Sequence, residues 1–228
     1  MSPNIIISYD GTNNEDDAVA LGRLLASAGA QVSLAYVRHA PEEETSREIL
    51  AQHEAETLLG RGAELLGDAD ALRHVITDRS TPAGLSKLAT QTDADLIVFC
   101  SDSHTAKGHI AVGNSAQRLL TGGSVAVAIA PAGYAQEGGS RLARGVAVAG
   151  DISAQSTAEA LASVLGAELV ASGQDAGLLV VGSRPEAEEG RVSLSAASEN
   201  LIENATCPVL VVPRGKALAF DGHAVAAL

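Results

Sequence analysis

The chain has 228 residues, with 15 Lys and Arg against 28 Asp and Glu, so its formal net charge is −13. This acidic balance excludes proteins that hold a nucleic-acid backbone or an anionic membrane surface with basic residues. Aromatic residues make up 2% of the chain, so the core must be built from Val, Ile, Leu and Ala, and a surface for stacking nucleic-acid bases is not expected.

Strand and helix patterns alternate through the first part of the chain. Apolar, β-branched runs predict buried strands, and apolar residues at helical spacing predict the helices between them. The expected strands are residues 4–10, 32–37, 72–77, 95–100 and 125–130, and the expected helices are about 15–28, 43–66, 81–91 and 114–121. Such alternation predicts an α/β fold with a parallel sheet and helices on both of its faces.

Local signals mark the ends of three of these helices. Thr12 and Glu15 have the spacing of a capping box at the start of the first helix, and Gly29 stops that helix. Thr81-Pro82 fits an N-cap followed by the first helical residue.

The second part of the chain repeats the first in a shortened form. Leu96–Ser101 resembles Leu178–Ser183 at an offset of 82 residues (178 − 96), and Val125–Pro131 aligns with Cys207–Pro213 at the same offset. The opening strand instead resembles residues 145–151 at an offset of 141 (151 − 10), so the second copy lacks 59 residues (141 − 82), which hold one strand and two helices. A period this long indicates duplicated domains.

Four segments follow from this duplication. We expect a full α/β domain at 1–135, a Gly-rich linker at 136–144, a truncated domain at 145–214 and a C-terminal tail at 215–228. The expected strands of the truncated domain are 145–150, 168–172, 178–182 and 207–212, and its expected helices are 154–165 and 197–204. The apolar tail either docks on the core or contacts a partner.

These segments resemble the universal stress protein family. Tyr9-Asp10-Gly11-Thr12 is similar to the end of the family's opening strand, residues 94–98 to its fourth strand, and residues 204–213 to its closing strand. The resemblance implies a flavodoxin- or Rossmann-like strand order 3-2-1-4-5, with a second sheet that lacks its edge strand. It also implies that the last strands of the two copies, Val125–Ala130 and Cys207–Val212, pair within one chain, and that the protein acts in a stress response by binding. Whether two chains form a homodimer stays open.

The resemblance also implies a site for an adenine nucleotide such as ATP. ATP-binding members carry G-x2-G-x9-G-S/T after the fourth strand, where glycines let backbone N–H groups approach phosphate oxygens. The first copy has Cys100, Ser103, Gly113 and Asn114 at these positions, so one of the three glycines is retained. By resemblance, Asp10 and Val37 lie near the adenosine. The candidate nucleotide-binding residues are Ser8, Asp10, Val37, Phe99, Cys100, Ser103, Gly113, Asn114 and Ser115.

Two interpretations of this first-copy loop remain open. In one, an adenine nucleotide binds weakly, with positive charge supplied by Lys107, His104 and His109. In the other, the chain is an interaction scaffold that binds no nucleotide and whose pockets are filled by its own side chains. The loop is then a solvated loop with a helix cap, and Asp10 is a turn residue.

The second copy is not expected to bind a nucleotide. It has Gly182, Pro185, Ser195 and Ala196 at the four positions, and Pro185 lacks the N–H that a phosphate would need. The same loop carries Glu186, Glu188 and Glu189, whose charges would repel a triphosphate. Asp151, the counterpart of Asp10, is expected to be structural.

Catalysis and metal binding are not expected. The chain has no Walker A sequence, no G-x-S-x-G motif and no G-x-G-x-x-G after its first strand. Its six His include no pair at H-x3-H spacing, so no metal site is predicted. A nucleotide-hydrolysing enzyme is a third interpretation, but it lacks a metal-binding carboxylate pair beside the loop.

The predicted location is the cytoplasm. The N-terminus lacks the basic residues and the long apolar run of a signal peptide, and no stretch approaches the roughly 18 apolar residues of a membrane span. Cys100 and Cys207 have no CxxC partner, so two buried free thiols are expected.

Overall fold

A single sheet runs through the protein in the computed structural model, which describes residues 2–12, 14–39, 45–137, 145–171 and 176–222. The sheet has nine strands in the order β3-β2-β1-β4-β5-β9-β8-β6-β7. The strands are β1 (Asn4–Ser8), β2 (Gln31–His39), β3 (Leu72–Asp78), β4 (Leu96–Cys100), β5 (Ala126–Ala130), β6 (Val146–Ala149), β7 (Leu169–Val170), β8 (Leu178–Gly182) and β9 (Val209–Val212). The helices are α1 (Glu15–Ser27), α2 (Thr45–Leu66), α3 (Thr81–Gln91), α4 (Asn114–Leu120), α5 (Tyr134–Glu137), α6 (Ile152–Leu165) and α7 (Ala196–Glu203).

The strand order confirms the predicted α/β fold. The first half of the sheet has the order 3-2-1-4-5, and β7-β6-β8-β9 repeats it as 2-1-4-5 without the edge strand. Neighbouring strands are parallel within each half, as expected for strands joined by helical crossovers. The two half-sheets are nevertheless continuous, and the division into domains at residues 135 and 145 stays a prediction.

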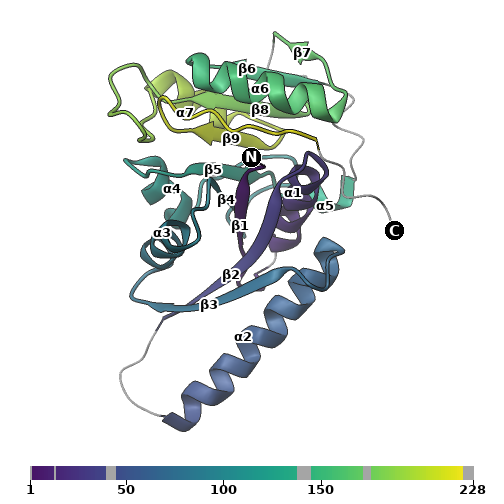
Figure 1. Cartoon of the computed structure of the whole chain (residues 1–228), viewed down its shortest axis with the longest axis vertical. Coiled ribbons are helices and arrows are strands. Elements are labelled where there is room, and N and C mark those ends of the chain that lie inside the picture. The colour runs from purple at the N-terminus through teal and green to yellow at the C-terminus, as the bar shows by residue number, and fades with distance from the viewer. Residues whose placement is uncertain (1, 13, 40–44, 138–144, 172–175, 223–228) are drawn as a thin grey trace.

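The two halves meet where β5 lies antiparallel to β9 (Figure 1). Ala128 faces Leu210 across this ladder, and these two residues are counterparts at the offset of 82. Val127 faces Val211, the counterpart of Ile129, and Ile129 faces Val209, the counterpart of Val127. The pair Ala128–Leu210 therefore marks a local two-fold axis between the halves.

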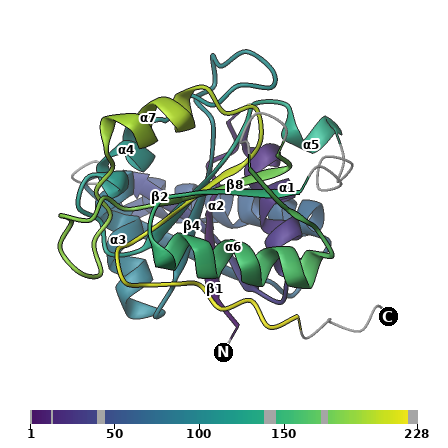
Figure 2. The same cartoon turned by 90° about the horizontal axis from the view of Figure 1, so that it is seen from above.

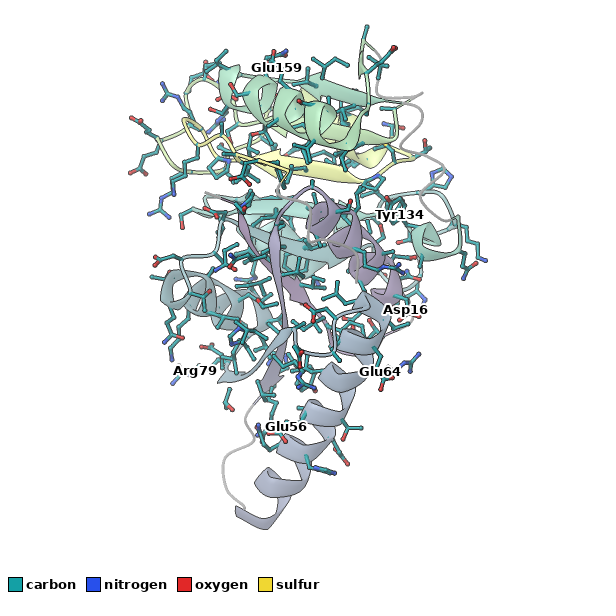
Figure 3. All side chains as sticks on the ribbon, turned by 45° about the vertical axis from the view of Figure 1, so that its right-hand side comes forward. Asp16, Glu56, Glu64, Arg79, Tyr134 and Glu159 are labelled. Carbon is teal, nitrogen blue, oxygen red and sulfur yellow. The ribbon has the colours of Figure 1, made fainter. Side chains whose placement is uncertain are left out.

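Helices cover both faces of the sheet and enclose two apolar clusters. One cluster contains Ile5 and Ile7 of β1 together with residues of α1, α2 and α6. The other contains Ile6 of β1 together with residues of α3, α4 and α7. Figure 1 shows α1 and α2 on one side of the first-half strands and α3 on the other. Exposed acidic residues cover the outside of the helices: Figure 3 shows Glu56, Glu64 and Glu159 on the outer surfaces of α2 and α6.

Each half ties the segment after its last strand to its own first helix. In the first half the carboxylate of Asp17, on α1, accepts the N–H groups of Gly133 and Ala135, both at 2.7 Å. In the second half the hydroxyl of Thr157, on α6, accepts the N–H of Leu218 at 2.9 Å. Burial raises the pKa of Asp17, while these two N–H bonds act to lower it.

The tail docks on the core as far as residue 222. Leu218 and Phe220 are buried in the cluster that contains α6, and the Ser2 hydroxyl donates to Asp221 at 2.7 Å. Figure 2 shows this segment passing along α6 to the N-terminus of the chain. The first of the two expectations for the tail is therefore confirmed for these residues, and residues 223–228 lie outside the described part.

Several predicted boundaries are wrong. β1 ends at Ser8 rather than residue 10, and β7 covers only Leu169–Val170 of the expected 168–172. Ser80, not Thr81, is the N-cap of α3, and its hydroxyl accepts the N–H of Ala83. The short α5 was not predicted and extends into the expected linker, of which residues 138–144 lie outside the described part. Gly29 does stop α1, with φ +96°.

The Thr157 bond predicts the contribution of the tail to stability. Thr157→Val keeps the shape of the side chain but leaves the buried N–H of Leu218 without its acceptor, so we expect the free energy of unfolding to fall by about 1–3 kcal/mol. The control is Thr90→Val, an exposed threonine whose hydroxyl bonds only its own helix. Equal urea midpoints for the two variants would contradict this role.

Candidate functional site

The candidate site lies where β1 meets β4 at the carboxyl edge of the first-half sheet. In the sheet, β2 is the neighbour of β1 on one side and β4 is its neighbour on the other, so the order of the strands reverses at β1. In α/β sheets such a reversal leaves a crevice at the carboxyl ends of the two strands. Asp10 and Gly11 follow β1 directly, and residues 101–113 follow β4. The two segments touch: the Asn14 side-chain amide donates to the carbonyls of Ser101 and Asp102, at 3.3 and 2.8 Å.

The turn after β1 is built around the carboxyl group of Glu15. This side chain is 4% exposed, and one of its oxygens accepts the N–H groups of both Asp10 and Gly11. The Asp10 carboxylate instead accepts the N–H of Thr12 at 3.1 Å. The predicted capping box is therefore wrong: α1 begins at Glu15 with Asn14 as its N-cap, and Glu15 bonds the turn before Thr12.

Burial decides the charge state of Glu15. Desolvation raises its pKa from 4.5 to about 9, helped by a hydrogen bond to the Asp10 side chain and by the charge of Asp10. Glu15 is consequently protonated at neutral pH. The neighbouring Cys100 thiol is half-buried, and desolvation together with Glu15 and Asp10 raises its pKa to about 12.

The structure separates the candidate residues into two faces. Val37 and Phe99 belong to the cluster on the α3 and α4 face, and strand alternation places Ser8 on the same face as Ile6 of that cluster. Cys100 packs on the opposite cluster. Val37 is 7% exposed and lies over Gly84, where an added Cβ would come within 2.8 Å of its Cγ1, so it is a wall of the core rather than an open contact surface.

The polar candidates remain accessible. Asp10, Ser103 and Asn114 are exposed, and Gly113 and Ser115 are half-buried. A Cβ built on Gly113 would have no atom within 4 Å, so open space lies above this backbone. Of the expected positive groups, Lys107 instead donates to Gln136 of α5 at 2.7 Å, whereas His104 and His109 are exposed.

The loops after β4 and β8 share one hydrogen-bond framework. In the first half the Ser101 hydroxyl donates to Ala130 at 2.8 Å and the Gly108 N–H to Ala132 at 2.8 Å. The counterparts at offset 82 do the same: Ser183 donates to Val212 at 2.9 Å, and Gly190 to Arg214 at 2.8 Å. These buried serines were not among the predicted residues, although a serine directly after the strand in both copies is a sequence signal for them.

At the corresponding place in the second half, the segments after β6 and β8 approach each other closely. Gly150 has φ +128°, and a Cβ on Gly182 would lie 2.6 Å from the Asp151 carboxylate. That carboxylate caps α6 by accepting the N–H of Ala154 at 3.1 Å, which confirms the structural role expected for Asp151. The first half has Cys100 at the position of Gly182.

Two further findings concern the described residues as a whole. They contain no group of three or more His, Cys, Asp or Glu side chains arranged to hold a metal ion. Nor does any helix in these ranges combine the length and apolar character that crossing a bilayer requires.

Comparison with known proteins identifies the class to which this fold and crevice belong. The sequence matches the universal stress protein family over residues 1–131 and 140–213, and the chain belongs to that family. Both copies recognised in the sequence fall within the matched residues, which confirms the resemblance. No curated protein gives a significant match.

Solved structures confirm the fold. A universal stress protein from Archaeoglobus fulgidus DSM 4304 is 18% identical, with a TM-score of 0.67, covering 94% of this chain and 100% of its own. A functionally unknown protein from Pseudomonas aeruginosa PAO1 is 13% identical, with a TM-score of 0.59, covering 93% of each chain. A universal stress protein in complex with cAMP is 18% identical, covers 42% of this chain and 73% of its own, and has a TM-score of 0.35, too low for an inference about this chain.

The buried Glu15 predicts a pH dependence of stability. Because its pKa rises from 4.5 to about 9 on folding, the folded protein holds a proton that the unfolded chain releases. The stability from this group is complete below the unfolded pKa and is lost as the pH rises toward 9. Glu15→Gln keeps an oxygen acceptor and removes the titrating group. The free energy of unfolding of this variant should therefore fall less steeply with rising pH than that of the wild type. Urea denaturation at several pH values, with exposed Glu64→Gln as control, tests this; equal slopes would contradict it.

The second half supplies a template for a stabilising change in the first. Ser195 stands at the position of Gly113, and its side chain accepts the N–H of Ser198 at 3.1 Å. Gly113 already has a compatible backbone, with φ −68° and ψ 159° against −86° and 158° for Ser195. Gly113→Ser should therefore raise the free energy of unfolding by about 0.5–1 kcal/mol, by capping α4 and restricting the unfolded chain. Gly108→Ser, at φ +80°, should lower it, and a loss of stability in both variants would count against the template.

Proposed function

We propose that this universal stress protein is a binding protein whose first half takes an adenine nucleotide, such as ATP, at the carboxyl edge between β1 and β4. The observation that carries the proposal is the difference between two otherwise matching loops. In the second half Asp151 caps α6 beside Gly182 and Ser195 stands in place of Gly113, whereas the first half has open space over Gly113 and exposed polar groups on Asp10 and Asn114.

Each part of the proposed site has a physical role. The open space over the backbone of Gly113 allows a phosphate to approach closely. The side chains of Asn114, Ser115 and Ser103 offer hydrogen bonds to the phosphate oxygens. Asp10 holds an exposed carboxylate that accepts hydrogen bonds from ribose hydroxyl groups. Ser8 offers a hydroxyl group at the adenine end, and the buried Val37 and Phe99 side chains belong to the apolar cluster on the same face. Cys100 contributes its backbone, because its side chain lies on the opposite face.

One observation favours the second candidate function, an interaction scaffold without a nucleotide. Glu15 already satisfies the N–H groups of Asp10 and Gly11, so the turn after β1 needs no external acceptor. Under this alternative the crevice is a solvated surface, and partners bind to other faces of the protein.

Neither function includes catalysis. Location in the cytoplasm and pairing of two chains remain predictions.

Titration calorimetry of the full chain with ATP, AMP and cAMP tests the proposal. We expect saturable heat and a thermal shift with at least one of these nucleotides. Asp10→Asn keeps the acceptor for the Thr12 N–H but removes the charge, and should weaken binding about three- to tenfold. Asn114→Ala should weaken it without loss of fold, because the second half carries Ala196 at this position.

The control for Asp10→Asn is Asp68→Asn. Asp68 is exposed and accepts the N–H of Asp70 at 3.1 Å, the same turn geometry as Asp10 and Thr12, but it lies beyond the far end of α2. Its affinity should equal that of the wild type. Absence of heat and thermal shift with all three nucleotides would remove the proposal and leave the scaffold.

A further inference from the structure

The second-half loop 183–195 reaches across to the first half and holds the turn that follows α4. The Gly122 N–H donates to the Val192 carbonyl at 2.8 Å, and the Val192 N–H donates back to the Gly123 carbonyl at 2.8 Å. The Arg191 guanidinium adds a bond to the Gly122 carbonyl at 3.2 Å. Val192 is fully buried, so this contact is a packed junction between the halves.

This contact is made in one direction only. The counterpart of Val192 at offset 82 is Ile110, and the counterparts of Gly122 and Gly123 are Asn204 and Ala205. Within the described residues the N–H groups of Asn204 and Ala205 bond to Asn200 and Ile202 of their own half instead. The first-half loop is held by Asn14 of its own α1. The two loops therefore have the same hydrogen-bond framework but different contacts. Loop 101–113 lies at the candidate site of its own half, whereas loop 183–195 binds the turn after α4 in the other half.

The gripped turn is directly connected to the candidate site. α4 has seven residues, begins beside Gly113 at the crevice and ends at the turn held by Val192. Its start has no side-chain cap, and so short a helix depends on tertiary contacts for its position. A displacement of the turn therefore moves Gly113, Asn114 and Ser115 as one body with the helix.

We propose that loop 183–195 is a clamp that positions α4, and that through it the shortened half controls the binding geometry of the first half. Arg191 and Val192 are positioning residues and do not contact the ligand. The effect on nucleotide affinity rests on the proposed function, whereas the mechanical link from the clamp to the start of α4 does not.

The test compares Arg191→Ala with Arg184→Ala. Both residues are exposed arginines of loop 183–195 and both variants lose one positive charge, but only Arg191 bonds the first half. Amide hydrogen exchange by NMR has two reporters: Gly122, in the clamp, and Gln117, whose N–H donates to Gly113 at 2.9 Å in the first turn of α4. We expect exchange at both sites to be about three- to tenfold faster in Arg191→Ala than in Arg184→Ala.

Nucleotide titration of the same variants separates the two proposals. If the wild type binds ATP, Arg191→Ala should bind it about three- to tenfold more weakly, and Arg184→Ala should match the wild type. If the wild type binds no nucleotide, the proposed function fails while the exchange data still decide the clamp. Faster exchange at Gly122 without a change at Gln117 would overturn the positioning role, and so would equal exchange in the two variants.

Discussion

The antiparallel ladder between β5 and β9 is the constraint on which the rest of the structure depends. Every residue of both strands is buried, and burying a Val, Leu or Ile side chain contributes about 1.5–3 kcal/mol. Both strands must therefore be apolar on their two faces, as their sequences are. Since β5 and β9 run in opposite directions, the carboxyl edges of the two half-sheets point to opposite ends of the ladder, and the two crevices cannot merge into one site.

The two halves have kept the same backbone and taken different roles. Their loops after β4 and β8 repeat the same hydrogen bonds, so this framework belongs to the fold that the two halves share. What differs is a few residues at the crevice: the second half has Gly182 beside the helix cap Asp151, while the first half has Cys100 at the position of Gly182, an exposed Asp10 and the protonated Glu15. Loss of one strand and two helices has shortened the second half without disturbing the strands that make the ladder.

The strands and the duplication could be predicted from long apolar runs and their spacing, whereas the strand order and the pairing of the last strands were predicted from the resemblance to the universal stress protein family. It could not predict partners chosen by a turn. Thr12 and Glu15 have the spacing of a capping box, yet the chain bends at Gly11, with φ +81°, and brings the N–H groups of Asp10 and Gly11 to Glu15 instead. Val37 was predicted from the family resemblance to lie near the adenosine; because Gly84 has no side chain, Val37 packs into the core, and its contact with a ligand stays a prediction. The bonds of Val192 to Gly122 and Gly123 join backbone atoms, so no pattern of side chains in the sequence predicts them.

The environment of Cys100 has a consequence for oxidation chemistry. Peroxides and electrophiles react with the thiolate, and burial, together with the charges of Glu15 and Asp10, raises the pKa of Cys100 to about 12, so that the thiol is the form present at neutral pH. Cys207 is fully buried beneath the second-half strands. The burial that raises the pKa of Cys100 thus also lowers its reactivity toward oxidants below that of a cysteine of ordinary pKa.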